Sequence, residues 1–494
     1  MIKAASFKGQ DVAVFGLGRT GLTAAKSLAA GGARVHAWDD REEAREQARS
    51  EGINLTDLTT SDWHDYAALV LSPGVPHKLP KPHWTAQRAD AANVPIICDI
   101  EIFARELNAR AKGNRPKIIA ITGTNGKSTT TALTAHVLAE CDRAVQMGGN
   151  IGRGVLDLDR MHAGMVYVLE LSSYQLERCP SLRADVAVFL NLSPDHLDRH
   201  GDLKGYEAAK RNIFNNQSAE DTAIIGVDNP QGRRLCTAMT ARNGRSVIPI
   251  SGQKSLGRGA CVIKGKLYCA QGRTVSEVAN LTHARALEGR HNWQNAAAAY
   301  AAVSALGINA EKIGKAILSF PGLAHRMETI GSVGRLRYVN DSKATNADAA
   351  RQALASYKNI YWIAGGVAKE GGIEPLNDLF GNIKKGYLIG EAAKPFAKTL
   401  KKNKVDCKLS GTLEAAILCA TKDALASNKS DTIILLSPAC ASFDQFKNFE
   451  LRGDAFKGKA KEIIAIFERE VASNRARKKE SAAHTSKSQS GAAA

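Results

Sequence analysis

The sequence predicts an α/β protein built from three successive Rossmann-like, nucleotide-fold domains. Short β-branched runs alternate with helical segments along almost the whole chain, which is typical of doubly wound, mostly parallel sheets. Gly-rich turns follow a predicted strand at residues 16–21 and again at residues 123–126. A length of 494 residues suits about three domains.

Composition limits the class of protein. Hydrophobic residues make up 44% of the chain, enough for several cores, and no apolar stretch is long enough to span a membrane. The first residues lead almost directly into a strand, so we expect no signal peptide. The nine cysteines lack C-x-x-C spacing, which indicates reduced thiols and a cytoplasmic protein.

The net charge of +18 is partly due to a basic, small and polar segment at residues 471–494. Such a composition cannot bury a core, so we predict a disordered tail. A solvated extension is the favoured interpretation, and an arm for nucleic acid or an anionic membrane is the alternative. No aromatic residues are interleaved for base stacking, so we expect no nucleic-acid partner.

The first predicted domain, residues 1–111, opens with a strand at 11–15, the turn GLGRTG at 16–21, a helix at 22–30 and a second strand at 34–38 that ends at Asp39. This G-x-G-x-x-G with a later acidic residue resembles a dinucleotide fingerprint. An NAD-dependent oxidoreductase is therefore one interpretation. The same elements would also hold a nucleotide-sugar diphosphate.

A further strand at 67–71 ends in Ser72-Pro73-Gly74-Val75. Open α/β sheets bind ligands at the carboxyl ends of their strands, so this turn is a candidate ligand contact. The polar, basic segment 108–117 has no apolar periodicity and indicates a domain boundary.

The central domain, residues 112–321, begins with a buried strand at 118–121 that runs into GTNGKST at 123–129. The glycines let backbone N–H groups face phosphates at a helix N-terminus. Lys127 can reach the β- and γ-phosphates, and Ser128 can ligate Mg²⁺. The match to G-x-x-x-x-G-K-[ST] is imperfect, because Ile121 occupies the first glycine position. The loop nevertheless predicts ATP binding by a P-loop-type ATPase domain.

Two other strand ends carry candidate metal ligands. Glu170 follows a strand at 166–169, and a strand at 186–190 leads into a turn with Asp195 and His196. Carboxylate and imidazole ligands without a thiol favour Mg²⁺ over zinc. From the residues alone, Lys210 is interpreted as a solvated helix lysine.

The third domain, residues 322–470, follows a boundary at 320–322 and is again predicted to be doubly wound. Its strand candidates share a short, apolar, β-branched composition and lie at 338–340, 360–364, 387–389 and 432–437.

Several motifs occur in the order found in the Mur ligase family, which the chain resembles up to about residue 467. They are GTNGKST, ELSSYQLE (170–177), SPDHLDRH (193–200), AAKRNIF (208–214), GRHNWQN (289–295), LAHRME (323–328) and NDSKATN (340–346). The resemblance implies an ATP-dependent amide-forming ligase of peptidoglycan synthesis that works through an acyl phosphate.

Within the family, GLGRTG with SPGV, DSKATN and SPACASFDQFKNFELRG (437–453) imply addition of D-glutamate to UDP-N-acetylmuramoyl-L-alanine. A sister ligase that adds another amino acid is the nearest alternative. The resemblance also implies ATP, two Mg²⁺ and a carbamylated Lys210, which would reverse the interpretation of that lysine as solvated. We expect a monomer with small-molecule substrates.

The resemblance assigns roles to individual residues of this sequence. Catalytic roles fall on Lys127, His196, Lys210, His325 and Lys343. Metal ligation falls on Ser128, Glu170, His196 and Lys210. ATP binding falls on Gly123, Thr124, Asn125, Gly126, Lys127, Ser128, Thr129, Asn295, Arg326 and Asp341. Substrate binding falls on Gly18, Arg19, Thr20, Gly21, Asp39, Arg41, Ser72, Asn150, Thr345, Lys369, Ser442 and Phe449. The loop around Lys369 reads GGVAKEGG and departs from the family pattern before the lysine.

Overall fold

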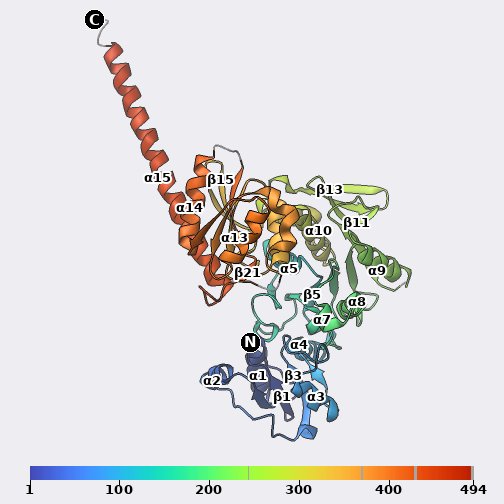
Figure 1. Cartoon of the computed structure of the whole chain (residues 1–494). Helices are drawn as coiled ribbons and strands as arrows, with labels where there is room; N and C mark the ends of the chain where they lie inside the picture. The colour runs from blue at the N-terminus through green and yellow to red at the C-terminus, as the bar shows by residue number, and fades with distance from the viewer. Residues whose placement is uncertain (243, 369–370, 428–430, 491–494) are drawn as a thin grey trace. The chain divides into compact units, whose positions relative to one another are not determined.

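The computed structural model describes residues 1–490 except 243, 369–370 and 428–430; for 285, 291 and most of 471–490 only the backbone is described. The chain forms two compact units, residues 1–320 (unit 1) and 321–494 (unit 2). Figure 1 colours the chain from blue at the N-terminus to red at the C-terminus. The two units are described separately below.

The first sheet of unit 1 is four-stranded and parallel, with the order β2-β1-β3-β4. Its strands are β1 (Asp11–Phe15), β2 (Arg34–Trp38), β3 (Tyr66–Leu71) and β4 (Ile96–Ile97). The helices of this part are α1 (Arg19–Gly31), α2 (Glu42–Ser50), α3 (Trp84–Ala91) and α4 (Asp99–Asn108). The predicted strands 11–15 and 34–38 are confirmed with the same bounds.

The second sheet of unit 1 is nine-stranded, with the order β13-β12-β11-β10-β9-β8-β5-β7-β6. Its strands are β5 (Lys117–Thr122), β6 (Val145–Gly149), β7 (Val166–Glu170), β8 (Val186–Phe189), β9 (Thr222–Gly226), β10 (Ser246–Ser251), β11 (Arg258–Ile263), β12 (Lys266–Gln271) and β13 (Thr274–Asn280). The helices of this part are α5 (Lys127–Glu140), α6 (Ser173–Leu176), α7 (Leu197–His200), α8 (Leu203–Arg211), α9 (Pro230–Ala241), α10 (Arg290–Ser304) and α11 (Ala310–Leu318).

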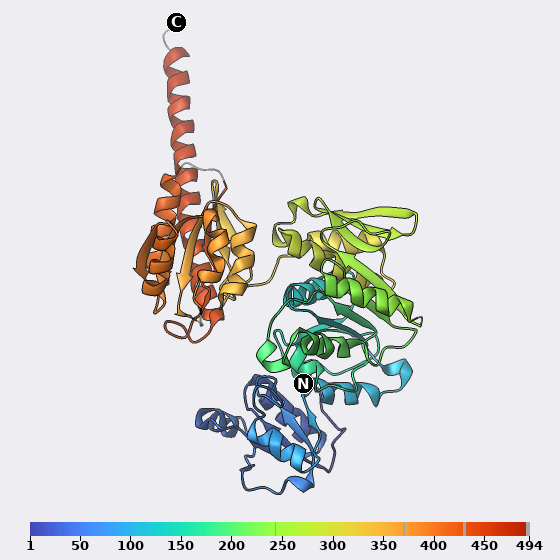
Figure 2. The same cartoon turned by 45° about the vertical axis from the view of Figure 1, so that its right-hand side comes forward.

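The predicted strands at 118–121, 166–169 and 186–190 are confirmed as β5, β7 and β8, and the parallel pairing runs from β6 through β11. β12 and β13 then extend the sheet from β11 as an antiparallel meander, which Figure 2 shows in yellow-green. These strands carry mixed polar and apolar residues, so their composition did not separate them from loops.

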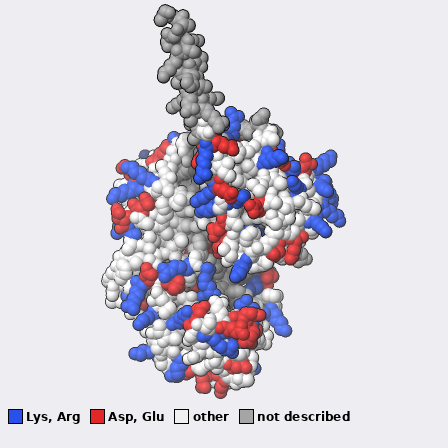
Figure 3. All heavy atoms as spheres, turned by 90° about the vertical axis from the view of Figure 1, so that its left-hand side faces the viewer, with Lys and Arg blue, Asp and Glu red and all other residues white. Residues whose placement is uncertain are grey.

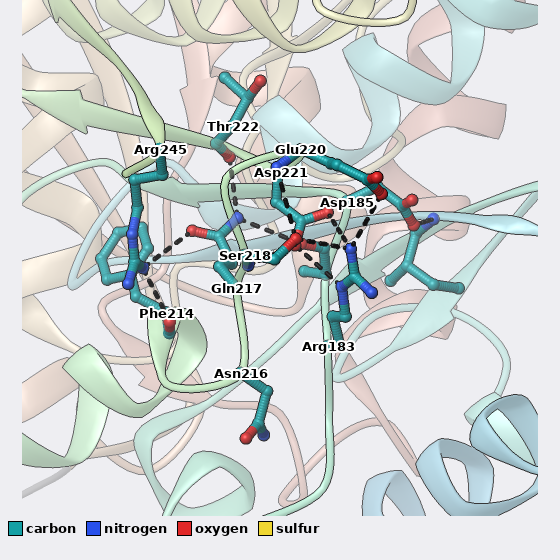
Figure 4. Close-up of polar contacts among 12 residues, drawn as sticks. Arg183, Asp185, Phe214, Asn216, Gln217, Ser218, Glu220, Asp221, Thr222 and Arg245 are labelled. Carbon is teal, nitrogen blue, oxygen red and sulfur yellow. Dashed lines mark hydrogen bonds and ion pairs between the residues drawn. The ribbon is translucent and has the colours of Figure 1, made fainter. Parts of the chain in front are cut away.

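The amino ends of β8 and β9 are fixed by a polar network (Figure 4). Arg183 Nε donates to Asp221 Oδ2 (2.9 Å), and Gln217 Nε2 donates to the carbonyl of Thr222 (2.9 Å). Arg245 Nη1 donates to the carbonyl of Phe214 (2.9 Å). Parallel strands present their ligand sites at their carboxyl ends. This network therefore stabilises the amino ends of the strands, opposite to the candidate site.

The two sheets of unit 1 share a continuous apolar core, which includes Val12, Phe103, Tyr167 and Phe189. The backbone N–H of Ile2 also donates to the carbonyl of Leu156 (2.8 Å). These contacts join the N-terminal sheet and the central sheet into one compact unit.

Unit 2 contains a six-stranded sheet with the order β14-β15-β20-β16-β18-β19, in which only the edge pair β14–β15 is antiparallel. Its strands are β14 (Glu328–Val333), β15 (Leu336–Asn340), β16 (Ile360–Gly365), β18 (Ile383–Ile389), β19 (Cys407–Gly411) and β20 (Thr432–Leu436), and β17 (Val367–Ala368) pairs with β21 (Cys440–Ala441). The helices are α12 (Ala347–Ser356), α13 (Ala393–Lys402), α14 (Leu413–Ala426) and α15 (Phe449–Ser490). The predicted strands of this section are confirmed.

The helix α15 continues to Ser490, so residues 471–490 are helical where the composition predicted a disordered tail. Its first part is anchored, since Phe456, Ala460 and Ile463 belong to the core of unit 2. Alanine, lysine, arginine and glutamate favour helix, and elongation from a formed helix is easier than nucleation. A segment that cannot form a core can therefore still extend a packed helix.

Lysine and arginine side chains are interspersed with aspartate and glutamate on the face drawn in Figure 3. The net charge of +18 is therefore not gathered into one basic patch on that face. Across the described residues, we find no helix whose length and apolar character would let it cross a membrane.

Candidate active site

The phosphate loop predicted from the sequence connects β5 to α5, and its conformation requires glycine. Gly126 has φ +84°, and a Cβ atom there would lie 2.3 Å from Oδ1 of Asn295. Asn295 belongs to α10, and its Oδ1 accepts a hydrogen bond from Thr130 Oγ1 (3.1 Å). The fold thus brings Asn295, predicted to bind ATP, against the loop.

The loop is also held by the segment that follows β8. The side chain of Asn191 accepts from the backbone N–H of Asn125 (2.9 Å) and donates to its carbonyl (3.1 Å). Thr124 N donates to the carbonyl of Asn191 (3.0 Å). These bonds fix the loop that places Lys127 and Ser128 in the first turn of α5, where backbone N–H groups and the helix dipole favour phosphate.

Lys210 is buried, so its interpretation as a solvated helix lysine is wrong. Its side chain is on α8, is 1% exposed, and donates from Nζ to the carbonyl of Gly123 (2.9 Å). Lys127 Nζ donates to the same carbonyl (3.0 Å). Burial, and then the positive charge of Lys127, hold the pKa of Lys210 well below its ordinary value, which favours a neutral amine.

Glu170 ends β7 and lies beside Ile121 of β5 in the sheet register. Its Oε1 accepts from Nδ2 of Asn150 (2.9 Å). Its Oε2 is buried without a hydrogen-bond partner among the described residues. An unpaired buried carboxylate oxygen is costly, and it is the type of ligand that Mg²⁺ prefers. Asn150, predicted to contact substrate, thus orients Glu170.

His196 lies in the turn after β8 with the left-handed φ of 51°, and Asp195 Oδ2 is 3.4 Å from its Nε2. Burial lowers the pKa of the His196 imidazole, which favours the neutral ring that metals bind. The described residues contain no group of three or more His, Cys, Asp or Glu side chains that could hold a metal. The predicted ligand set of Ser128, Glu170, His196 and Lys210 remains a prediction.

A cavity of about 350 Å³ lies at the carboxyl end of the N-terminal sheet. Its lining contains four predicted substrate contacts and other residues, namely Phe15, Gly16, Gly18, Asp39, Asp40, Arg41, Ser72, Val75 and His83. Arg19, Thr20 and Gly21 form the first turn of α1 beside it. The carboxylate of Asp39 accepts from the backbone N–H groups of Leu17 (2.7 Å) and Arg41 (3.0 Å). Asp39 therefore shapes the turn.

Val75 belongs to the turn 72–75 that the sequence indicated as a ligand contact, but sequence reasoning missed Phe15, Asp40 and His83 in this cavity. Phe15 and Asp40 are neighbours of predicted residues at strand ends, which could have indicated them. His83 carries no motif; Asp40 fixes its ring through Nε2 (3.0 Å).

In unit 2, the predicted ATP contact Asp341 follows β15. Its Oδ2 accepts from Ser437 Oγ (2.8 Å), and its Oδ1 accepts from the backbone N–H of Met327 (3.2 Å). Burial raises the pKa of Asp341 to about 7, partly offset by Ser437 and the charge of Arg326. The fold thus places Arg326 and Asp341 in one polar cluster.

Two other predicted residues of unit 2, His325 and Lys343, lie beside Phe449 at the start of α15. His325 Nδ1 lies 3.1 Å from Asn340 Nδ2, and its ring packs against Phe449 (6.3 Å between centroids). Lys343 Nζ lies 5.6 Å from the centroid of the Phe449 ring. Thr345 N donates to the carbonyl of Lys343 (2.9 Å), and Ser442 is buried. Lys369 lies outside the described residues.

The fold and the site define a phosphate-loop protein with a separate cavity at the carboxyl end of its N-terminal sheet. Residues 121–303 match the family described as Mur ligase middle domain. A protein from a Caulobacter species named UDP-N-acetylmuramoylalanine--D-glutamate ligase is 59% identical over 92% of this chain and 97% of its own. The chain belongs to the Mur ligase family, an ATP-dependent ligase family that uses Mg²⁺.

Other relatives carry the same name. The protein from Phenylobacterium zucineum is 58% identical over 94% of this chain and 98% of its own. Among solved structures, UDP-N-acetylmuramate-alanine ligase from Thermotoga maritima has a TM-score of 0.56 at 18% identity, covering 92% of this chain and 99% of that one. That likeness concerns the fold. The family membership removes the NAD-dependent oxidoreductase interpretation.

Proposed function

We propose that this chain joins the amino group of D-glutamate to the carboxylate of UDP-N-acetylmuramoyl-L-alanine in peptidoglycan precursor synthesis. The observation that carries the reaction class is the meeting of Lys127, Lys210 and Glu170 at the phosphate loop. The choice of D-glutamate is supported by the name of relatives that are 48–59% identical to the chain. We also propose that the protein is a cytoplasmic monomer.

The reaction proceeds in two steps. A carboxylate oxygen of the UDP-linked substrate attacks the γ-phosphorus of ATP, which gives an acyl phosphate and ADP. The deprotonated amine of D-glutamate then attacks the acyl carbon, and the tetrahedral intermediate expels phosphate to form the amide. Lys127 and the N–H groups of the loop stabilise negative charge on the transferred phosphoryl group.

Two Mg²⁺ ions would be held by Ser128, Glu170, His196 and modified Lys210, and they would neutralise the crowded phosphate oxygens. The orphaned Oε2 of Glu170 fits this role. CO₂ would add to the neutral amine of Lys210, forming an N–C bond and releasing a proton. The resulting carbamate is an anion that suits a Mg²⁺ ligand, whereas a protonated lysine would repel the cation.

The uridine diphosphate end would bind in the cavity of the N-terminal sheet, against Ser72 and Arg41. Arg326, Asp341 and Asn295 would bind ATP, with His325 and Lys343 in support. D-Glutamate would bind to Thr345, Lys369, Ser442 and Phe449, where a lysine and hydroxyls suit its side-chain carboxylate.

The test is phosphate release by the purified chain with ATP, Mg²⁺ and UDP-N-acetylmuramoyl-L-alanine, with D-glutamate, L-glutamate, L-alanine or L-lysine added in turn. We expect release with D-glutamate only, and a loss of about 100-fold or more in Lys127→Ala. Release with another amino acid would assign a sister ligase. No release with any of them would refute the proposal.

Carbamylation is tested by ¹³C NMR after equilibration with ¹³C-bicarbonate. We expect a carbamate signal that is lost in Lys210→Ala and kept in Lys204→Ala, since Lys204 is an exposed lysine on the same helix. A signal that persists in Lys210→Ala, or no signal in the unmodified chain, would contradict the assignment.

A further inference from the structure

The loop 72–75 forms one wall of the cavity on the N-terminal sheet. Ser72 and Val75 line the cavity. Ser72 Oγ donates to the carbonyl of Gly16 (2.6 Å), and Val75 N donates to the carbonyl of Ser72 (3.1 Å). The position of this loop therefore sets the shape of the cavity and of the Gly-rich turn beside it.

Two arginines from the central part of unit 1 hold this loop by its backbone carbonyls. Arg199 donates from Nη1 to Gly74 (3.0 Å) and from Nη2 to Val75 (3.2 Å). Arg178 donates from Nη1 to Leu71 (2.9 Å) and Ser72 (3.3 Å). A planar guanidinium can serve two carbonyls at once, which an ammonium group does less well. The cavity wall is therefore hydrogen-bonded to the segments of the central part that contain α6 and α7.

Arg199 belongs to the same turn as His196, three residues earlier. Its guanidinium carbon lies 4.5 Å from the centroid of the Tyr174 ring, and the His196 ring lies 5.1 Å from that centroid. The ring of Tyr174 also stacks on the ring of His200, with an interplanar angle of 17°. The loop, Arg199, Tyr174 and His196 thus form an unbroken series of contacts.

His200, which also stacks on the Tyr174 ring, is held in place by two polar contacts. His200 contacts Ser173 Oγ through Nε2 (2.9 Å) and Glu177 Oε1 through Nδ1 (3.2 Å). His196 keeps a left-handed backbone that costs a non-glycine residue free energy and persists only where its surroundings fix it. A displacement of the loop would consequently change the position of His196.

We infer that Arg199 is a positioning residue that couples occupancy of the cavity on the N-terminal sheet to the phosphate-loop site of the central sheet. The inference rests on the proposed function for the identity of the two ligands, a uridine nucleotide and an adenine nucleotide. Arg199 itself is not among the residues that line the cavity. It transmits the position of the loop 72–75 to the turn that carries His196.

Coupling is measured with UDP as the probe, by calorimetric titration of the full chain with and without saturating Mg·ADP. Coupled sites change each other's affinity by the same factor, commonly about fivefold or more. We expect Mg·ADP to change the UDP dissociation constant about fivefold in the unmodified chain, and to leave it unchanged within error in Arg199→Gln. Arg199→Lys should keep part of the effect.

The control is Arg234→Gln, which alters an exposed arginine on α9 and should keep the full coupling factor. The thermal unfolding midpoint of each variant shows whether it folds. If Arg199→Gln does not fold, the coupling factor of Arg199→Lys is used to test the inference. An undiminished factor in both Arg199 variants, or no coupling in the unmodified chain, would overturn the inference alone. Failure of the unmodified chain to bind UDP would overturn the proposed function as well.

Discussion

Asp99, the first residue of α4, is a buried carboxylate. It interacts electrostatically with Arg178, the arginine that donates to the carbonyls of Leu71 and Ser72. Asp99 is 3% exposed, and its Oδ1 accepts from Gln175 Nε2 (3.4 Å). Burial raises its pKa from the ordinary 3.8 to about 6, against the opposing effects of Gln175 and of the Arg178 charge. Desolvation is thus expected to outweigh the attraction of the neighbouring cation.

The sign of the pH effect follows from proton binding. Between pH 3.8 and about 6, folded Asp99 holds more proton than unfolded Asp99, so stability falls as pH rises through this range. The loss amounts to about 3 kcal/mol when pH exceeds both values, with roughly half of it reached at pH 5. Asp99→Asn keeps the shape and an acceptor oxygen but cannot ionise, so it avoids this loss.

The assay is the melting temperature of the two proteins from pH 5 to pH 7.5. Unit 1 spans residues 1–320, for which about 1 kcal/mol corresponds to about 1.5 °C. Asp99→Asn should therefore melt about 4 °C above the unmodified chain at pH 7.5 and about 2 °C above it at pH 5. Asp90→Asn, at an exposed position of α3, should show no such trend.

A variant that melts below the unmodified chain at pH 7.5 would refute the reasoning. It would mean that the attraction between Asp99 and Arg178 exceeds the cost of burying the carboxylate. A difference that does not change with pH would show that the pKa of Asp99 is not raised by folding.

Three further predictions concern the loop and the core. Gly126→Ala should lower kcat/KM for ATP by about 100-fold, because its Cβ would meet Asn295 Oδ1 at 2.3 Å; phosphate release near the normal rate would contradict this. Asn191→Asp should raise KM for ATP about tenfold and leave KM for the UDP-linked substrate unchanged, since a carboxylate cannot donate to the carbonyl of Asn125. Equal changes in both KM values would show that the substitution disturbs the whole fold and not the phosphate loop alone. Phe456→Ala should destabilise unit 2 by about 3–5 kcal/mol, because Phe456 is fully buried; a shift of under 1 °C in the melting of that unit would disprove the packing argument.

The sequence by itself determined the phosphate loop and most strands of the parallel sheets. The loop is local: a strand, two glycines and a helix start follow one another within residues 117–129, so their order predicts the geometry. Strands such as β1 and β3 were equally readable from the sequence, because a buried parallel strand needs a nearly continuous apolar run. β12 and β13 were not readable, since an antiparallel extension tolerates mixed polar and apolar residues.

Only the tertiary structure decided which side chains meet at the site. Lys210 contacts a carbonyl 87 positions away, and its local pattern is that of an exposed helix. Glu170 comes beside the loop because β5 pairs with β7, and His83 reaches the cavity through the packing of α3. Burial and charge at these positions depend on sheet register and long-range packing, which the short-range order of residues does not encode.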